Sequence, residues 1–323
     1  MDNKSNSELA RLEDAARAAW LYYVAKNTQD EIAQKLEVSR QSAQRLVALA
    51  VSEGLIKVRL EHPITKCMEL GEQLKSTFSL LECEIVPSDP IDNASVHGLA
   101  QTSAAVLERY LKSEQPKTLA FGTGRALKAC IDELPSMQCP QHKIVSLLGN
   151  MMSDGSASAF DIVVSMSNRV QAKHYPMPLP VIANSVEEKN LLHELTPVKS
   201  ILSLVEQADA TFVGIGQMSG QSPLMLDGFI NQMQLNELVN DSAAGEIISW
   251  VYDQQGRLLD HPINQLVMSS PLKINASKPV YGIAAGNSKV DAILGALRGG
   301  LINSLITNEY TAEQILLRVN KSI

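Results

Sequence analysis

The first 60 residues hold three segments whose apolar positions recur with the period of an α-helix. The positions expected to face inward are Leu12, Ala16, Ala19, Trp20 and Tyr23 in residues 8–26, Ile32, Ala33 and Leu36 in a short second helix, and Ala43, Leu46, Val47 and Ala50 in a third. Thr28 and Glu31 form a capping box for the second helix, and Ser39 can cap the third. Gly54 is expected to end the third helix, and the alternating residues 55–60 predict a strand after it.

The third helix carries a polar outer face next to a tight turn. The candidate DNA-binding residues are Arg40, Gln41, Gln44 and Arg45 on this face, Ser39 and Ser42 at its start, Gln29 at the start of the preceding helix, and Lys57 and Arg59 on the strand. A recognition helix enters the major groove in this geometry, where Arg suits guanine and Gln suits adenine, while the strand would contact phosphate. The alternative is a solvated face of a three-helix bundle. The order of capped helix, turn, glycine and basic strand favours DNA binding.

Beyond residue 60, short apolar strands end in glycine and run into helices, after a connecting helix at 66–80 and another helix at 94–112. The units are strand 119–121 with Gly122, Thr123, Gly124 and Arg125, strand 143–148 with Gly149 and Asn150, strand 210–213 with Gly214 and Gly216, and strand 280–283 with residues 284–289. Such units predict an α/β domain with a parallel sheet covered on both faces, and a ligand site at the carboxyl ends of the strands. We expect the four strand ends to line one pocket.

Charged residues near these ends are candidates for ligand contacts. Arg125 lies beside the free amides of a helix N-terminus, which is a ready anion site. Lys289 is expected in a helix first turn, where a cation opposes the helix dipole and a bound anion or a carboxylate would explain it. Glu246 follows Gly245 at the head of an apolar strand, where it could accept hydrogen bonds from sugar hydroxyls. The alternatives are solvent-facing charges, and glycines that only fit tight turns.

Composition limits the class of protein further. The 323 residues carry a net charge of −7, yet residues 1–60 have nine Lys and Arg against eight Asp and Glu. DNA contacts would therefore come from a local patch. Cys67, Cys83, Cys130 and Cys139 lack metal-ligand spacing, so neither a metal site nor a disulfide is predicted. The charged N-terminus and the lack of a long apolar run predict a cytoplasmic protein, and no cofactor is expected.

Six segments of the chain share an order and spacing with a known family. They are TQDEIA (28–33), VSRQ (38–41), FGTGRAL (121–127), GIG (214–216), AGEI (244–247) and the C-terminal block AAGNSKVDAILGALRGGLINSLITNE (284–309). Together they resemble the SorC/DeoR family of sugar-responsive bacterial transcriptional regulators. The resemblance covers almost the whole chain, and the C-terminal block is its most distinctive part.

The resemblance implies a winged helix-turn-helix at 1–60 joined to a Rossmann-like, parallel-sheet effector domain at 61–323, assembled as a dimer or tetramer. By matching motif, residues 122–125 and Lys289 would hold the phosphate of a sugar phosphate, and Glu246 would contact hydroxyls. The family loop often has a threonine where this chain has Ala126. The resemblance then implies an effector that is either a sugar phosphate whose phosphate is held more weakly or an unphosphorylated polyol.

The expected function is that of a DNA-binding regulator of a carbohydrate or polyol operon, controlled by a sugar, sugar phosphate or polyol and without catalysis. One alternative is a sugar-phosphate isomerase or deaminase with an N-terminal appendage, and another is a DNA-binding scaffold with a vestigial pocket. No nucleophile elbow supports the enzyme. The sequence leaves open the effector, the operator and the sign of regulation.

Overall fold

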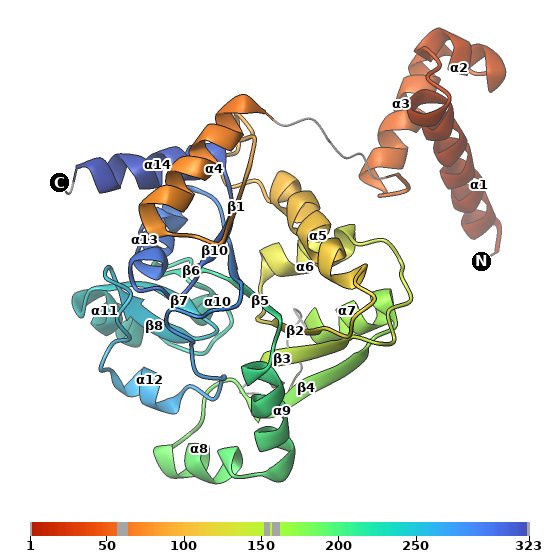
Figure 1. Ribbon diagram of the computed structural model, residues 1–323. Helices are drawn as coiled ribbons and strands as arrows, with labels where there is room; N and C mark the ends of the chain where they lie inside the picture. The colour runs from red at the N-terminus through yellow and green to blue at the C-terminus, as the bar shows by residue number, and fades with distance from the viewer. Residues whose placement is uncertain (1, 57–63, 152–155, 157–161, 322–323) are drawn as a thin grey trace. The chain divides into compact units, whose positions relative to one another are not determined.

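The computed structural model describes residues 2–56, 64–151, 156 and 162–321. The chain groups into two compact units, Met1–His62 and Pro63–Ile323, both drawn in Figure 1. Lys57, Arg59 and most of the strand expected at 55–60 lie outside the described residues, so the basic strand stays a prediction.

The small unit is a set of helices packed on small apolar side chains. Its elements are α1 (Asp2–Ala19), a π-helical turn η1 (Trp20–Val24), α2 (Gln29–Lys35) and α3 (Arg40–Ser52). Ala18, Ile32, Ala43 and Val47 form a buried cluster among them. The expected inward position of Trp20 is wrong, because this side chain is 56% exposed. The π-helical turn that begins there changes the helical phase and turns the residue outward.

Both predicted caps of the small unit are confirmed. Thr28 Oγ1 accepts from the Glu31 amide, and the Glu31 carboxylate accepts from the Thr28 amide at 2.7 Å. Ser39 Oγ accepts from the Ser42 amide at 3.1 Å. These bonds satisfy amides that a helix N-terminus leaves without an intrahelical partner, so they fix where α2 and α3 begin.

The large unit is built on a seven-stranded, wholly parallel sheet of order β1-β10-β9-β5-β2-β3-β4. The strands are β1 (Glu82–Val86), β2 (Thr118–Phe121), β3 (Lys143–Met151), β4 (Lys173–Pro180), β5 (Ala210–Gly214), β9 (Val280–Ile283) and β10 (Ser304–Asn308). The predicted α/β fold with a parallel sheet is confirmed. Parallel strands need crossover connections, and helices supply them here.

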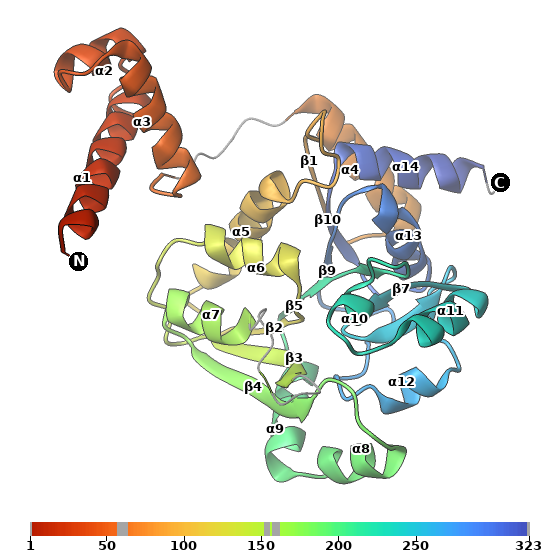
Figure 2. The same ribbon diagram turned by 180° about the vertical axis from the view of Figure 1, so that it is seen from behind.

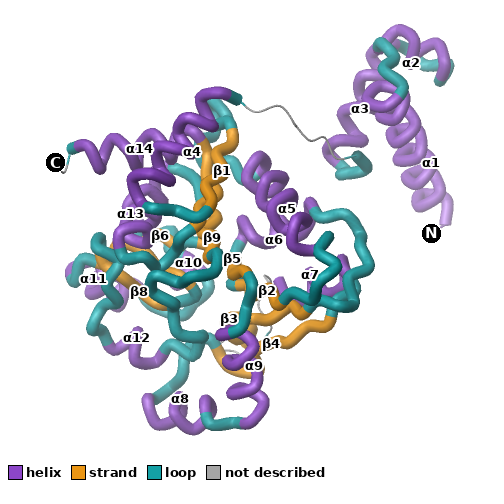
Figure 3. The backbone as a smooth tube through the Cα atoms, in the orientation of Figure 1, coloured by secondary structure: helices purple, strands orange, loops and turns teal. Residues whose placement is uncertain are grey.

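Helices cover both faces of this sheet (Figures 2 and 3). One face carries α5 (His97–Leu111), α6 (Arg125–Glu133) and α7 (Ile162–Val170); the other carries α4 (Thr65–Phe78), α9 (Thr196–Glu206), α13 (Val290–Arg298) and α14 (Glu309–Asn320). Strand residues alternate between the two cores: Leu119 and Phe121 pack under α5 and α6, whereas Ala120 packs on the opposite side. This alternation explains why the strands read as continuous apolar runs.

A second, three-stranded antiparallel sheet of order β6-β7-β8 lies beside the first. Its elements are β6 (Gly216–Gln217), β7 (Ala243–Ile247) and β8 (Trp250–Asp253), with α8 (Val186–His193), α10 (Pro223–Leu226), α11 (Gln232–Asn240) and α12 (Pro262–Leu266) completing the unit. Glu246 belongs to this sheet. It lies near the end of β7, so its expected place at the head of a strand of the parallel sheet is wrong.

The strand expected at residues 143–148 also differs from the one observed. Gly149 and Asn150 were expected in a loop after the strand, but β3 runs on through both to Met151. A register shift against β4 occurs at Gly149. A Cβ there would overlap the backbone of Leu179, so only glycine permits this close pairing.

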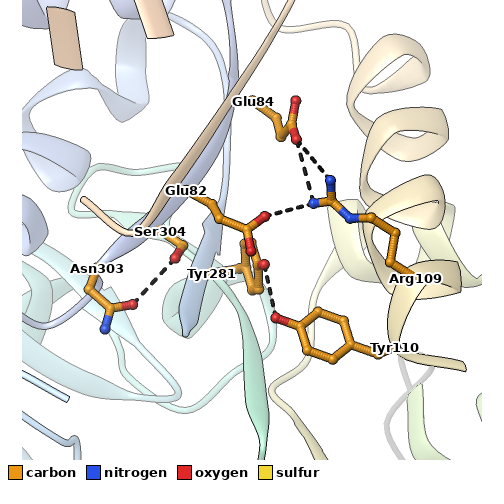
Figure 4. A network of polar contacts seen from close by, with 7 residues as sticks. All are labelled: Glu82, Glu84, Arg109, Tyr110, Tyr281, Asn303 and Ser304. Atoms are coloured by element: carbon orange, nitrogen blue, oxygen red, sulfur yellow. Dashed lines mark hydrogen bonds and ion pairs between the residues drawn. The ribbon is translucent and has the colours of Figure 1, made fainter. Parts of the chain in front are cut away.

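The amino end of the parallel sheet is closed by polar contacts (Figure 4). Arg109 of α5 donates to Glu82 at 2.6 Å, and the Tyr110 and Tyr281 hydroxyls lie 3.1 Å apart. The buried His142 accepts from the Lys117 amide at 3.0 Å through Nδ1, and its Nε2 lies 3.1 Å from the Leu111 carbonyl oxygen. These contacts tie α5 to the amino ends of the strands.

Candidate functional site

A cavity of about 330 Å³ opens at the other, carboxyl end of the sheet. Strands β2, β3, β5 and β9, which are neighbours in the sheet, all contribute to its wall through their last residues or the loops that follow. Residues of β6, β7 and α10 close it from the side of the small sheet. Ligands of open α/β sheets bind at this edge.

Nine of the eleven effector-binding residues expected from the sequence line this one cavity. They are Gly122, Thr123, Gly124, Arg125, Gly149, Gly214, Gly216, Glu246 and Lys289. Gly245 does not line it. Its backbone instead packs against α13, where a Cβ would lie 2.6 Å from that of Ala292. The side chain of Asn150 lies outside what the structure describes, so its expected contact with the effector stays a prediction.

Glu246 is a buried carboxylate in the wall of the cavity, with 8% of its surface exposed. Its Oε2 accepts from the Ser249 amide at 2.8 Å. A Cβ on Gly216 would overlap this carboxyl group, so the glycine makes room for it. Burial raises the pKa of Glu246, while the Ser249 amide and the nearby Lys289 act in the opposite direction.

The Ser249 amide is held in place by a strained turn. Ile248 and Ser249 form the two-residue loop between β7 and β8, with φ angles of 45° and 72°. Two positive φ values are typical of a type I′ turn, which usually takes Asn or Gly, and a β-branched residue there is an outlier. Ile248 is nevertheless buried at the cavity, and its Cγ2 lies where a Cβ on Gly122 would be only 3.0 Å away. Strain of this kind clusters at ligand sites.

Lys289 reaches the cavity from the end of a short 3₁₀ turn, η2 (Asn287–Lys289), directly before α13. Its Nζ donates to the Ile215 carbonyl oxygen at 2.8 Å. Burial lowers the pKa of Lys289 to about 8, although the Glu246 carboxylate works against the change and Arg125 adds to it. The ammonium group is therefore ionised at pH 7, and it loses its proton at a pH only slightly higher.

Asp227 and Gln217 are among the polar residues of the wall that the sequence did not indicate. Asp227 follows α10, and burial raises the pKa of its carboxyl group while Arg125 lowers it. Gln217 Nε2 donates to the Gln221 carbonyl oxygen at 2.9 Å, and its buried Oε1 has no hydrogen-bond partner among the described residues. Neither residue stands in a strand–glycine–helix unit, which is why the pattern gave no signal for them.

In the small unit, the expected DNA-binding side chains of α3 share its outer face. Arg40, Gln41, Gln44 and Arg45 are all exposed, whereas Ala43 and Val47 of the same helix are buried. Arg40 Nε lies 3.5 Å from an exposed Asp30 carboxylate. Gln29, Ser39 and Ser42 stand at the starts of α2 and α3, and Gln29 differs from the others in that its Oε1 is buried.

The described parts of the chain offer neither a metal site nor a membrane span. No group of three or more His, Cys, Asp or Glu side chains there could hold a metal ion. Among the same residues, no helix has the length and apolar character needed to cross a membrane.

Residues 62–317 match a family model described as "Putative sugar-binding domain". The erythritol catabolism regulatory protein EryD of Brucella abortus is 28% identical, over 95% of this chain and 97% of its own. The sorbitol operon regulator of Klebsiella pneumoniae is also 28% identical, over 96% and 99%. The chain belongs to the SorC/DeoR family of transcriptional regulators. Its fold agrees, because the crystal structure of full-length SorC from Klebsiella pneumoniae matches 94% of this chain and 97% of its own with a TM-score of 0.70 at 26% identity.

Membership in this family covers both units of the chain. The matched domain model spans all the residues that line the cavity, from Ala94 to Lys289, and the full-length regulators extend the match to nearly the whole sequence. The expectation of a sugar-responsive transcriptional regulator is thereby confirmed.

Proposed function

We propose that this SorC/DeoR regulator binds operator DNA through α3 and is controlled by a small sugar-type effector in the cavity at the carboxyl end of the parallel sheet. The observation that carries the proposal is the meeting of glycine loops, Lys289 and Glu246 around one cavity of about 330 Å³. That volume suits a small polar molecule of a few carbon atoms, and ligand sites of this kind are few per protein.

The cavity wall offers what a carbohydrate needs. Glu246 supplies carboxylate oxygens that accept from hydroxyl groups, and charge-assisted bonds of this type are stronger than neutral ones. Lys289 donates to the Ile215 carbonyl oxygen, and an ammonium group has further N–H groups that can donate to a ligand oxygen. Effector binding would then shift the equilibrium between states of the regulator with different affinity for DNA.

DNA binding is assigned to the exposed face of α3. Arg40, Gln41, Gln44 and Arg45 would read base edges, and Lys57 and Arg59 would contact phosphate. A near-neutral unit of this size has few phosphate contacts, so tight binding needs more than one copy, joined through residues 61–323. A fragment of residues 1–60 should therefore bind the operator far more weakly than the full chain, and equal affinity would contradict the assembly.

The proposed regulator carries out no catalysis. One observation favours the alternative of a sugar-phosphate isomerase or deaminase, namely that the cavity holds a lysine and carboxylates with shifted pKa values, as active sites do. A turnover assay with pentose and hexosamine phosphates separates the two functions. The regulator should give no product, while the operator should be released when its effector is added. Conversion of any of these phosphates would support the enzyme.

A thermal-shift screen against polyols, sugars and their phosphates tests the sensing role most widely. A ligand of the cavity should raise the melting temperature of the wild type and not that of Lys289→Ala. A chain that responds to no member of the panel would instead be a DNA-binding scaffold with a vestigial pocket.

A further inference from the structure

The charges on the cavity wall cancel. Among the described residues that line it, Arg125 and Lys289 are cationic, and Asp227 and Glu246 are carboxylates. Burial raises the pKa of the Asp227 carboxyl group, and Arg125 is close enough for its guanidinium to act in the opposite direction. A phosphate monoester carries about −1.5 to −2 charges near neutral pH. In this wall it would meet two carboxylates together with the two cations.

Several hydrogen-bonding groups of the wall are acceptors. Gln217 Oε1 is a buried acceptor without a partner among the described residues, while its amide nitrogen donates to the Gln221 carbonyl oxygen. Ser146 Oγ donates to the Leu148 carbonyl oxygen at 2.6 Å, so toward a ligand this hydroxyl oxygen can only accept. Glu246 and Asp227 are acceptors when ionised. Arg125 and Lys289 are donors in the wall, and the acceptors named here favour a ligand that brings hydroxyl donors. The oxygens of a phosphate dianion have none to give.

We propose that the effector is an uncharged polyol or free sugar, and that Asp227 is the residue that discriminates against its phosphate ester by offsetting the charge of Arg125. The inference rests on the proposed function of the cavity and names the class of molecule that it takes. Asp227 acts on the ligand's charge, whereas Glu246 and Gln217 accept hydrogen bonds from its hydroxyls.

Isothermal titration of the full-length protein with matched pairs tests this directly. The pairs are erythritol with erythritol 4-phosphate, ribitol with ribitol 5-phosphate, and sorbitol with sorbitol 6-phosphate, with inorganic phosphate as a further probe. For the pair that binds, the wild type should prefer the parent polyol by about tenfold or more. Asp227→Asn keeps the size and a hydrogen-bonding group while removing the charge, so the preference should shrink by about tenfold or reverse.

The matched control is Asp241→Asn, which removes the same charge from an exposed position off the cavity wall and should leave the preference unchanged. A wild type that binds a phosphate ester more tightly than its parent would overturn the inference and leave the sensing function standing. The comparison of the two ligands on the wild type does not depend on whether a variant folds. An unchanged preference in Asp227→Asn would also overturn it. If neither member of any pair binds, the proposed function fails, and the inference fails with it.

Discussion

The two ends of the parallel sheet use polar residues in opposite ways. At the amino end, Arg109 donates to Glu82, and the Tyr110 and Tyr281 hydroxyls contact each other (Figure 4). At the same end, both ring nitrogens of His142 have hydrogen-bond partners. At the carboxyl end, Gln217 has an acceptor without a partner among the described residues, and partial burial lowers the pKa of Lys289.

The difference separates groups that stabilise the fold from groups that wait for a ligand. A buried polar network whose members are satisfied adds stability, whereas a buried acceptor without a donor costs free energy until a donor arrives. The strained turn at Ile248 lies at the carboxyl end as well. Changes at the amino end should therefore alter stability alone, and changes at the carboxyl end should alter the response to the effector.

The largest effect is expected at the amino end. His142→Ala removes a fully buried ring together with its contacts to Lys117 and Leu111, so the free energy of unfolding should fall by about 2–4 kcal/mol. The exposed His174 provides the control, with an expected change within about 0.5 kcal/mol for His174→Ala. Urea unfolding measures both. Equal effects of the two substitutions would show that the amino-end network contributes nothing.

In the DNA-binding unit, Arg40→Ala and Arg45→Ala should each weaken operator binding by about 1–3 kcal/mol, because each removes a base contact. Binding of the effector should not change. The control is Arg17→Ala, which removes an equally exposed arginine that pairs with Glu13 on α1. Fluorescence anisotropy with labelled operator measures these affinities. If both α3 variants kept wild-type affinity, this face would not be the recognition surface.

The partial burial of Lys289 predicts that stability depends on pH. Lys289 has a pKa of about 8 in the folded chain against 10.5 as the ordinary value. Between these values the unfolded chain binds the proton that the folded chain has released, so the free energy of unfolding rises with pH. Relative to Lys289→Met, the wild type should gain about 1–2 kcal/mol from about pH 7.5 to about pH 9.5.

Trp250 fluorescence during urea unfolding, in a Trp20→Phe background, follows this change within the large unit. Taking the difference from Lys289→Met cancels the other titrating groups. A difference that stays constant with pH, or that moves in the opposite sense, would mean that the lysine titrates normally.

The smallest effect is expected for Tyr110→Phe. It removes one hydroxyl that pairs with Tyr281 and should lower the free energy of unfolding by about 1 kcal/mol, with no change in effector affinity. Thermal unfolding with and without the effector checks both parts. A loss of effector affinity here would break the division between the two ends of the sheet.

The sequence predicted the parallel sheet well because its strands are buried on both faces and end in glycine. The caps at Thr28 and Ser39 were predictable for a similar reason, since capping depends on residues a few positions apart. Glu246 was found by the small residues before it, but its strand was placed in the wrong sheet. The antiparallel pairing of β6, β7 and β8 depends on contacts between segments far apart in sequence.

Asp227 and Gln217 could not be found from the sequence for the same reason. Gln217 ends the two-residue strand β6 and Asp227 directly follows α10, and only the packing of these two elements over the sheet brings the side chains to the cavity. The phase change at Trp20 was likewise invisible, because the apolar pattern of α1 continues across the π-helical turn.

The central claim is that the cavity at the carboxyl end of the sheet controls a DNA-binding unit through Lys289 and its neighbours. The most direct test is effector-dependent release of operator DNA from the full-length wild type, Lys289→Ala and Glu246→Gln, using a polyol or sugar found by the thermal-shift screen. The wild type should release the operator. Lys289→Ala should bind the operator normally and not release it, and Glu246→Gln should need more effector, because it keeps an acceptor without the charge. Wild-type release by Lys289→Ala would contradict the claim and show that this lysine has no part in sensing.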